Sequence, residues 1–466
     1  MTSWFDLNVE EVLEHWPVSF AIRELIANAL DEQAITGTAD PLIRKEGPGR
    51  WVIRDHGRGL RYQHLTQNEN AEKRDHPTVI GQFGMGLKDA LAVFHRRGVE
   101  VAISSPHGDI TTALRPKEGF PDLSTLHAAV RPSSRPAEPG TRITLHGVSD
   151  EDVAAAQRYF LRYSGDRLLE QTRYGQVLAR PDDGPGNLYV KGLLVAREEN
   201  FLFSYNITSL TKPLRQALNR ERSNVGRTAY ADRVKAILVE CRSAEVARPL
   251  ADDLEHYRTG GMHDELAWSD VRVHACRVLA GHERVVFVTG HQLTFGGPQV
   301  EYAREEGYRL VLVPDDLAAR IAGQVDLAGR PMLDLNAYRE AWNEGFSFQF
   351  VEPDELTPAE AEVFGLTDKI IELGGFDLEQ LGVEQIRISE TMRLAEPGRM
   401  IVGLWDPAAG RIVIRRDRLA TPAGYCGDLL HELVHAESGH TDGTLDFEDA
   451  LTERLGAIMA ELVTTP

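Results

Sequence analysis

The chain has 466 residues, and its 71 acidic and 51 basic side chains give a formal net charge of −20. A chain of this length is too long to fold around one hydrophobic core, and it predicts about three domains. The negative charge argues against a nucleic-acid partner, because phosphate backbones would be repelled. The three cysteines are widely spaced, which argues against a disulfide framework. The sequence has no signal-peptide pattern and no run of ~18 apolar residues, which argues against a membrane partner. We therefore expect a cytoplasmic protein.

Loop-like segments divide the chain into predicted domains. Three segments resemble loops or boundaries: a cluster of proline and serine at residues 131–140, the turn PDDGPG at 181–186, and the mixed stretch YRTGGMHDE at 257–265. We expect domains at residues 1–150, 151–260, 261–395 and 396–466. Residues 285–313 follow a pattern of strand, helix and strand, which predicts a small α/β unit. The predicted fold class is therefore a multidomain combination of α+β and α/β architecture.

The first chemical pattern lies on a predicted helix near the N-terminus. At ~100° per residue, Glu24, Asn28 and Asp31 fall on one polar face, opposite an apolar face that includes Ile22 and Leu25. Such a face can line a pocket, or it can be the solvated side of an amphipathic helix. The segments that follow in the chain favour the pocket.

Two of these segments pair a polar side chain with glycine at the end or start of a strand. A β-rich run ends in Asp55, Gly57 and Gly59, where a carboxylate can accept a hydrogen bond from a base amine and glycine permits a close backbone approach. Gly140 and Thr141 open an alternating strand. Each segment alone is also compatible with an ordinary turn or strand entry.

A third segment carries Gly81, Gly84 and Gly86 directly before a predicted helix. Bare backbone amides and a helix N-terminus together favour the binding of phosphate groups. A single glycine cluster is a weak signal of phosphate binding. Here it follows the helix of Glu24 and the segment of Asp55 in the chain.

In this order, the segments ELIANALDE, DHGRG, GQFGMG and GT resemble the nucleotide-binding motifs of the GHKL superfamily, which includes gyrase B, the heat-shock chaperone of ninety kilodaltons, MutL, MORC ATPases and histidine kinases. The resemblance implies a Bergerat-type α/β sandwich that binds ATP with Mg²⁺. By this resemblance, Glu24 would orient and deprotonate the attacking water, Asn28 would ligate Mg²⁺ and Asp55 would contact the adenine amine. The other positions of the implied nucleotide site are Asp31, Gly57, Gly59, Gly81, Gly84, Gly86, Lys88 and Thr141.

Domain order narrows the resemblance. Histidine kinases place a dimerisation helix before the ATP module, whereas here only ~15 residues precede it. Chaperone-like and MutL-like members follow the module with a transducer domain that supplies a lysine to the terminal phosphate, and they commonly dimerise when the lid over ATP closes. We therefore expect a lid at residues 61–78, a transducer-like domain, and a homodimer. Lys212 is the candidate lysine, with Arg220 and Arg222 as competitors.

A second constellation lies near the C-terminus, where HELVH falls on a predicted helix. His431 and His435 are one turn apart and can grip one Zn²⁺, while Glu432 can polarise a bound water as general base. The same five residues can also arise as two ordinary surface histidines. A third ligand would decide between these interpretations.

The third ligand is expected on the last predicted helix. Glu448 projects beside Phe447 within an apolar stripe, and a buried carboxylate there would need a partner such as a metal. Glu448 is therefore the predicted third zinc ligand, and His440, Asp442 and Glu453 remain alternatives.

The last ~60 residues resemble the gluzincin class of metallopeptidases, in which a glutamate from the next helix completes the zinc site. This resemblance implies a zincin-like domain and hydrolysis of an unknown protein or peptide. The preferred hypothesis is an ATPase whose nucleotide state gates a zinc peptidase. The alternatives are an ATP-driven clamp or chaperone-like scaffold with a structural or inactive zinc site, and an ATPase acting on DNA, which the net charge opposes.

Overall fold

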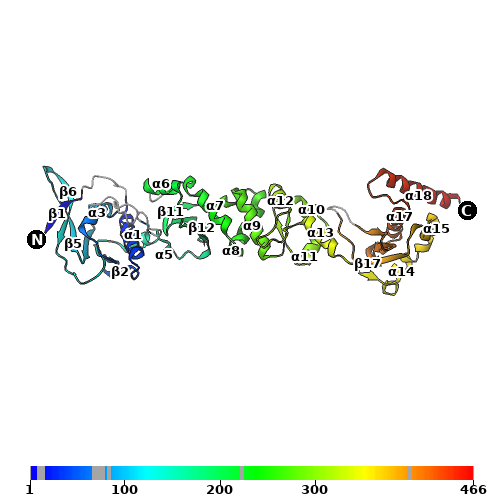
Figure 1. The fold of residues 1–466 in the computed structure, drawn as a ribbon, viewed down its shortest axis with the longest axis horizontal. Coiled ribbons are helices and arrows are strands. Elements are labelled where there is room, and N and C mark those ends of the chain that lie inside the picture. Colours follow the sequence, from blue (N-terminus) through cyan, green and yellow to red (C-terminus); the bar gives the residue numbers. More distant parts are fainter. Residues whose placement is uncertain are drawn as a thin grey trace. The chain divides into compact units, whose positions relative to one another are not determined.

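The computed structural model describes residues 2–7, 16–65, 79–80, 86–220, 225–395 and 401–464. The chain divides into two compact units, Met1–Leu279 and Ala280–Pro466, whose elements are drawn in Figure 1. Within the described ranges, no helix combines the length and the apolar character needed to cross a membrane. The predicted multidomain combination of helices and sheets is confirmed at this level, and the described sheets are antiparallel, parallel and mixed.

The first unit begins with a seven-stranded antiparallel sheet of order β1-β6-β5-β4-β7-β3-β2. Its strands are β1 (Ser3–Asp6), β2 (Leu42–Gly47), β3 (Arg50–Arg54), β4 (Glu100–Ser105), β5 (Gly108–Lys117), β6 (Phe120–Arg131) and β7 (Arg142–His146). Side chains of β4 alternate between exposed and more buried positions, as expected for a sheet with one covered face.

Helices α1 (Val18–Thr36) and α3 (Gly86–Arg96) pack against each other over this sheet, α4 (Asp150–Gln157) packs against α1, and a short 3-10 helix spans Tyr62–Leu65. Ile22, Phe94 and Leu145 belong to the shared core. On α1, Glu24 and Asp31 are only 3% and 1% exposed. Because buried charges need partners, this burial argues against a solvated polar face and in favour of a site.

A second sheet of five strands follows, with order β11-β10-β12-β9-β8. Its strands are β8 (Leu168–Gln171), β9 (Gly175–Ala179), β10 (Gly186–Val190), β11 (Leu193–Glu198) and β12 (Phe203–Ile207). The helices of this part are α5 (Leu161–Ser164), α6 (Lys212–Arg220), α7 (Ala231–Glu240), α8 (Ala244–Leu254) and α9 (Ser269–His282), with 3-10 turns at Arg227–Ala229, Glu255–Arg258 and Asp264–Ala267. The predicted succession of strands, loop and helix before residue 220 is therefore observed.

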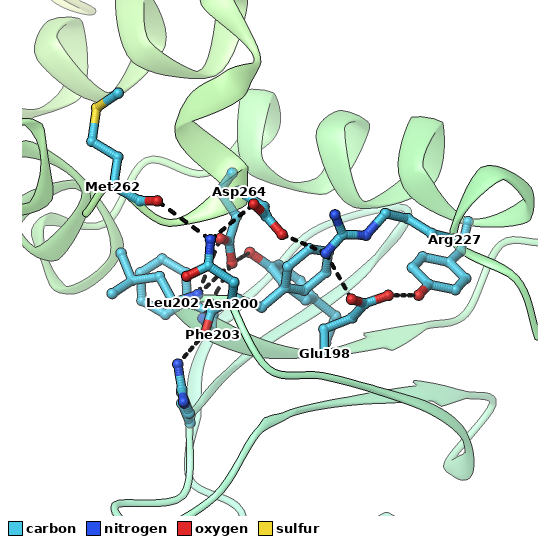
Figure 2. A network of polar contacts seen from close by, with 12 residues as sticks. Glu198, Asn200, Leu202, Phe203, Arg227, Met262 and Asp264 are labelled. Carbon is cyan, nitrogen blue, oxygen red and sulfur yellow. Dashed lines mark hydrogen bonds and ion pairs between the residues drawn. The ribbon is translucent and has the colours of Figure 1, made fainter. Parts of the chain in front are cut away.

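A polar network ties the segment after α8 back to the second sheet (Figure 2). The fully buried carboxylate of Glu265 accepts hydrogen bonds from the backbone N–H groups of Leu202 and Phe203, at 2.9 and 3.2 Å, and from the Tyr205 hydroxyl at 2.9 Å. Arg227 lies between Asp264 and Glu198 and pairs with both. These contacts place residues 261–279 with the first unit, whereas the sequence pattern suggested a boundary at residue 260.

The second unit contains two sheets. The first is parallel, with order β14-β13-β15, and consists of β13 (Val285–Val288), β14 (Arg309–Leu312) and β15 (Leu333–Asp334). Its helices are α10 (Gly290–Phe295), α11 (Pro298–Glu305), α12 (Asp315–Ile321) and α13 (Leu335–Gly345). This confirms the small α/β unit predicted at residues 285–313.

The other sheet of the second unit is mixed, with order β16-β17-β19-β18, so that β18 lies at its edge. Its strands are β16 (Phe350–Val351), β17 (Gln385–Ser389), β18 (Gly403–Asp406) and β19 (Arg411–Arg415). The helices are α14 (Pro358–Phe364), α15 (Thr367–Gly374), α16 (Leu378–Leu381), α17 (Pro422–Ser438) and α18 (Leu445–Thr464), with 3-10 turns at Pro353–Glu355 and Arg416–Ala420. Isoleucines of β17 and β19 share one core with Leu429, Leu433 and Val434 of α17.

Candidate nucleotide and metal sites

Asp55 lies at the end of β3 and is buried against the start of β7. Its Oδ1 accepts hydrogen bonds from the backbone N–H groups of Gly57 and Thr141, at 3.0 and 3.1 Å. The Thr141 hydroxyl in turn accepts the N–H of Leu60 at 3.0 Å. Burial raises the pKa of the Asp55 carboxyl, and the two amide bonds oppose that shift. Both amide bonds fall on Oδ1, and a carboxylate can in addition accept from a ligand amine.

Two glycines allow this close approach of strands and loop. Gly140 has a φ of +89°, and a Cβ there would lie 2.0 Å from the Asp55 carbonyl oxygen. A Cβ at Gly57 would lie 2.3 Å from Cγ of Glu32. Gly140 therefore requires glycine, whereas a side chain at Gly57 would displace the Glu32 side chain.

The acidic residues of α1 face the segment that leads into the predicted phosphate loop. Asp31 Oδ1 accepts the N–H of Ile80 at 2.7 Å, directly before that loop. Gly81 and Gly84 lie outside the described residues, as do residues 66–78 of the predicted lid. Gly86 is buried at the start of α3, and Lys88 is half-buried two residues further along that helix.

Sequence reasoning missed Lys191, which reaches this region from the second sheet. Lys191 stands in the turn between β10 and β11 with a left-handed φ of 50°, and its ammonium donates to the Val79 carbonyl at 3.3 Å. Burial lowers the pKa of Lys191, and the nearby charge of Asp31 opposes this shift. The sequence does contain a signal for this position, because Lys191 and Gly192 form a turn-like pair between two apolar strand patterns.

The sequence-based candidates for the phosphate lysine lie elsewhere in the second sheet's domain. Lys212 is exposed at the start of α6. The side chain of Arg220 and the whole of Arg222 lie outside the described residues. Among the described basic residues of this domain, Lys191 is therefore the one with a described contact to the segment before the predicted phosphate loop.

The second cluster is built on α17, where His431 and His435 project from one face. Their Nε2 atoms lie 3.1 Å apart, and Asp442 Oδ1 lies 3.0 Å from the first and 3.2 Å from the second. In a tetrahedral zinc site with bonds of about 2.0 to 2.1 Å, ligand atoms lie about 3.3 Å apart, so the three atoms nearly form one face of such a tetrahedron. Within the described part of the chain, this is the one group of histidine and acidic side chains with metal-binding spacing.

Neighbouring groups set the state and orientation of the two imidazoles. His435 Nδ1 lies 2.8 Å from the carbonyl oxygen of His440, which can only accept, so Nδ1 carries a hydrogen and Nε2 is the nitrogen that faces His431 and Asp442. The ring of Phe447 stacks on His435 at 4.1 Å and meets His431 edge-on at 4.8 Å. Burial lowers the pKa of His431, which favours the neutral form that ligates metals.

The positions of the candidate side chains show which of them contacts the two histidines. Asp442, left open as an alternative by the sequence, is the carboxylate that meets both histidines. The side chain of Glu448 is exposed, contrary to the predicted burial, because α18 leaves Leu455, Met459 and other apolar side chains of its stripe outside the core. Glu453 is exposed as well, and His440 contributes its backbone carbonyl.

Glu432 lies between the histidines but turns toward the edge strand β18. Its Oε2 accepts the N–H of Trp405 at 2.8 Å, and a Cβ at Gly403 would lie 2.7 Å from its Oε1. Burial raises the pKa of Glu432 to about 7. A buried carboxylate with such a proton affinity can take up and release a proton near neutral pH, as a general base must.

Comparison with known proteins identifies relatives of this chain. A protein-family model described as the Mycoplasma pneumoniae MPN635 N-terminal domain matches residues 151–244. One curated protein of Mycoplasma pneumoniae is 37% identical over 239 residues, which are 50% of this chain and 96% of that protein. Another is 24% identical over 351 residues, 70% of this chain and 96% of that protein. Both are named only as uncharacterized proteins.

Proposed function

This chain belongs to the same family as these Mycoplasma pneumoniae proteins, and we propose that it is a GHKL-type ATPase whose second unit carries a zinc-dependent peptidase site. The observation that carries the ATPase proposal is the buried Asp55 carboxylate, held by Gly57 and Thr141 across two strands. This carboxylate offers an acceptor for the adenine amine in a Bergerat-type sandwich.

The proposed chemistry is the attack of water on the terminal phosphorus of ATP, which releases ADP and phosphate. Glu24 takes the proton of that water, and Asn28 ligates the Mg²⁺ that neutralises phosphate charge. By the resemblance, the phosphates would meet the glycine segment that ends at Gly86, and Lys88 would add a contact; Gly81 and Gly84 of that segment lie outside the described residues. We assign the lysine that reaches the terminal phosphate to Lys191 in place of Lys212, because Lys191 contacts the segment next to that loop.

For the second unit, we propose that His431, His435 and Asp442 hold Zn²⁺, which supplies a Lewis acid and an activated water. When bound, the ion would supply the Lewis-acid chemistry of catalytic zinc sites with three protein ligands. Glu432 would be the group that accepts a proton when water adds to a peptide carbonyl. A zincin-like arrangement of α17 beside the edge strand β18 is consistent with this role.

The ATPase proposal is tested by nucleotide binding and by hydrolysis of labelled ATP. Asp55→Asn keeps an acceptor for the two backbone amides but presents an amide donor to the adenine amine, so ATP binding should weaken by roughly 100-fold. Glu24→Gln should bind ATP normally and lose turnover. Asp183→Asn, at an exposed loop position, is the matched control. Unchanged ATP affinity in Asp55→Asn would reject the assigned pocket.

The peptidase proposal is tested by zinc content and by cleavage of an unstructured protein substrate such as casein. Glu432→Gln should retain zinc and lose cleavage, because it removes the base but none of the proposed ligands. One bound zinc per chain without cleavage of any substrate would favour the clamp or scaffold function. We also propose that two chains associate when ATP binds, which light scattering with and without a non-hydrolysable analogue would reveal.

A further inference from the structure

Helix α18 buries one side and leaves a second apolar side exposed. Phe447 is 3% exposed, and Leu451 and Ile458 pack against the core that α17 shares with the mixed sheet. At ~100° per residue, a further set of apolar side chains falls on the adjoining side of the helix. This set, which we call the exposed row, has exposed fractions of 46% to 77% and consists of Leu445, Leu455, Met459, Leu462 and Val463.

Acidic side chains accompany the exposed row. By helical spacing, four exposed carboxylates lie within the row or along its outer border, away from the core: Glu448, Asp446, Asp449 and Glu453. Arg454 is the one basic residue of α18, and its guanidinium pairs with Glu437 of α17 and lies 4.6 Å from the ring centre of Phe376. The helix therefore presents an apolar surface with a negative edge.

The arginines near α18 do not neutralise this edge. Residues 401–464 contain no lysine, and each of their arginines has an ion-pair partner elsewhere than on α18 or, for the last one, on α17: Arg411, Arg415, Arg416, Arg418 and Arg454. The acidic side chains of α18 have no ion pair within the described part of the chain. Their charge is therefore available to a cationic partner.

The second unit as a whole carries the negative charge of the protein. Residues 280–466 contain 33 acidic and 15 basic side chains, whereas residues 1–279 contain 38 and 36. A surface with one sign of charge raises the local concentration of oppositely charged chains. The unit that holds the zinc cluster thus favours the approach of basic polypeptides.

Helix α18 begins at the proposed metal site. Phe447 stacks on His435 and meets His431 edge-on, and Asp442 precedes the first residue of the helix by three positions. With a rise of 1.5 Å per residue, Met459 lies about 18 Å from Phe447 along the helix axis. An extended polypeptide of roughly six residues spans this distance. One chain can therefore reach both the exposed row and the zinc cluster.

Charge distinguishes the occupants that an apolar row can have. A second copy of α18 would bring acidic borders together, which is unfavourable, and an anionic lipid surface or nucleic acid would be repelled. A segment that combines lysine or arginine with apolar residues gains apolar burial and charge complementarity at once.

We propose that the exposed row and its acidic border bind a basic amphipathic segment of the polypeptide that the zinc site cleaves. This inference rests on the proposed peptidase function and adds the substrate class, which is polypeptides that carry basic and apolar residues close together.

The test measures peptide binding to the full-length Glu432→Gln protein, which should retain zinc without cleaving the peptide. Three labelled peptides of about 20 residues, long enough to cover α18, share one cleavable segment of mixed sequence and differ in a second segment. That segment holds lysine and leucine at helical spacing, glutamate and leucine in the same order, or lysine and serine. Fluorescence anisotropy should give a Kd for the lysine–leucine peptide roughly tenfold below the other two, and about 0.5 M salt should reduce its advantage over the glutamate–leucine peptide.

Variants of α18 locate the binding surface. Met459→Ser with Leu462→Ser removes apolar contacts, and Asp449→Asn with Glu453→Gln removes charges of the border. Each pair should raise the Kd for the lysine–leucine peptide severalfold. Glu461→Gln makes the same kind of charge change on the side of α18 away from the exposed row and should leave this Kd unchanged. Because all these side chains are exposed, thermal unfolding should be the same in every variant.

Separate outcomes distinguish the inference from its premise. Equal affinities for the three peptides, or an affinity order that no α18 variant changes, overturns the docking surface. A dimer that light scattering detects and that Met459→Ser with Leu462→Ser abolishes would identify a second copy as the occupant and overturn it as well. Cleavage by the unmodified protein is followed by mass spectrometry. Binding in the expected order without any cleavage, at one zinc per chain, rejects the peptidase alone, whereas cleavage with equal kcat/KM for the three peptides rejects the docking surface alone.

Discussion

Asp442 and Glu448 are both exposed carboxylates near the histidine pair, yet only Asp442 places an oxygen within 3.2 Å of both ring nitrogens. Asp442→Asn should therefore weaken zinc binding by more than the roughly 10- to 100-fold that is typical of changes to outer-shell partners. Glu448→Gln is the matched variant and should bind zinc normally. Competition with a chromogenic chelator measures both affinities, and the reverse order would restore Glu448 as the ligand.

Glu265 is a buried carboxylate whose role is structural. Because it receives two backbone N–H groups and the Tyr205 hydroxyl, Glu265→Ala leaves three buried donors without an acceptor and should lower the unfolding free energy by roughly 3 kcal/mol. The exposed neighbour Glu199, changed to Gln, should have almost no effect. Urea unfolding measures the free energy of unfolding of both variants. Equal values would show that the Glu265 network does not stabilise this part of the chain.

The burial of Glu265 also predicts that the stability of the protein depends on pH. Burial raises the pKa of Glu265, so the folded chain binds this proton more tightly than the unfolded chain does. Its stabilising contribution is then complete below the unfolded pKa of about 4.3 and is lost as the pH rises through the folded value. The stability of the unmodified protein relative to Glu265→Gln should therefore fall as the pH rises above about 4.3. A constant difference across that range would contradict the shift.

At the scale of elements, the hairpin of β10 and β11 matters because its turn carries Lys191 to the nucleotide region. Lys191→Met keeps the length of the side chain and removes its charge, so turnover of ATP should fall at least about tenfold if one charge-assisted phosphate contact is lost. Lys212→Met, on α6, is the control and should retain turnover. Steady-state hydrolysis distinguishes them, and a defect confined to Lys212→Met would return the assignment to α6.

Local patterns predicted the elements better than the contacts between them. The helix of Glu24, the strand before Asp55 and the helix of His431 all follow from period and composition, and each is observed. Periodicity did not single out Lys191, and it left Asp442 as one of several alternatives, because a hairpin turn and a loop acquire neighbours only through packing of distant segments.

Helical periodicity was misleading where a helix is only partly covered. The 3.6-residue pattern of α18 matches a buried stripe, but much of that stripe is exposed among the described residues, with Leu455, Met459 and Leu462 about half accessible. Period indicates which side chains share a face, and it does not indicate whether anything covers that face. The predicted burial of Glu448 assumed that the apolar face of α18 is covered.

At the scale of the whole molecule, the proposed nucleotide and zinc sites belong to different compact units. Each unit has its own hydrophobic core, which predicts two thermal unfolding transitions in the full chain. A ligand present at 100 times its Kd stabilises the unit that binds it by about 2.7 kcal/mol. An ATP analogue and zinc should therefore each raise a different transition.

Gating requires more than two independent sites, because a ligand shifts an equilibrium only by its differential affinity for the two states. If the nucleotide state controls the zinc domain, a non-hydrolysable ATP analogue should change the Kd for zinc by roughly 5- to 150-fold, and zinc should change the nucleotide affinity by the same factor. Titrating zinc into the Glu24→Gln protein with and without the analogue measures this coupling. Asp55→Asn, which should bind no nucleotide at the concentrations used, must show no change. An identical Kd for zinc in both conditions would mean that the two units act independently and that the gate does not exist.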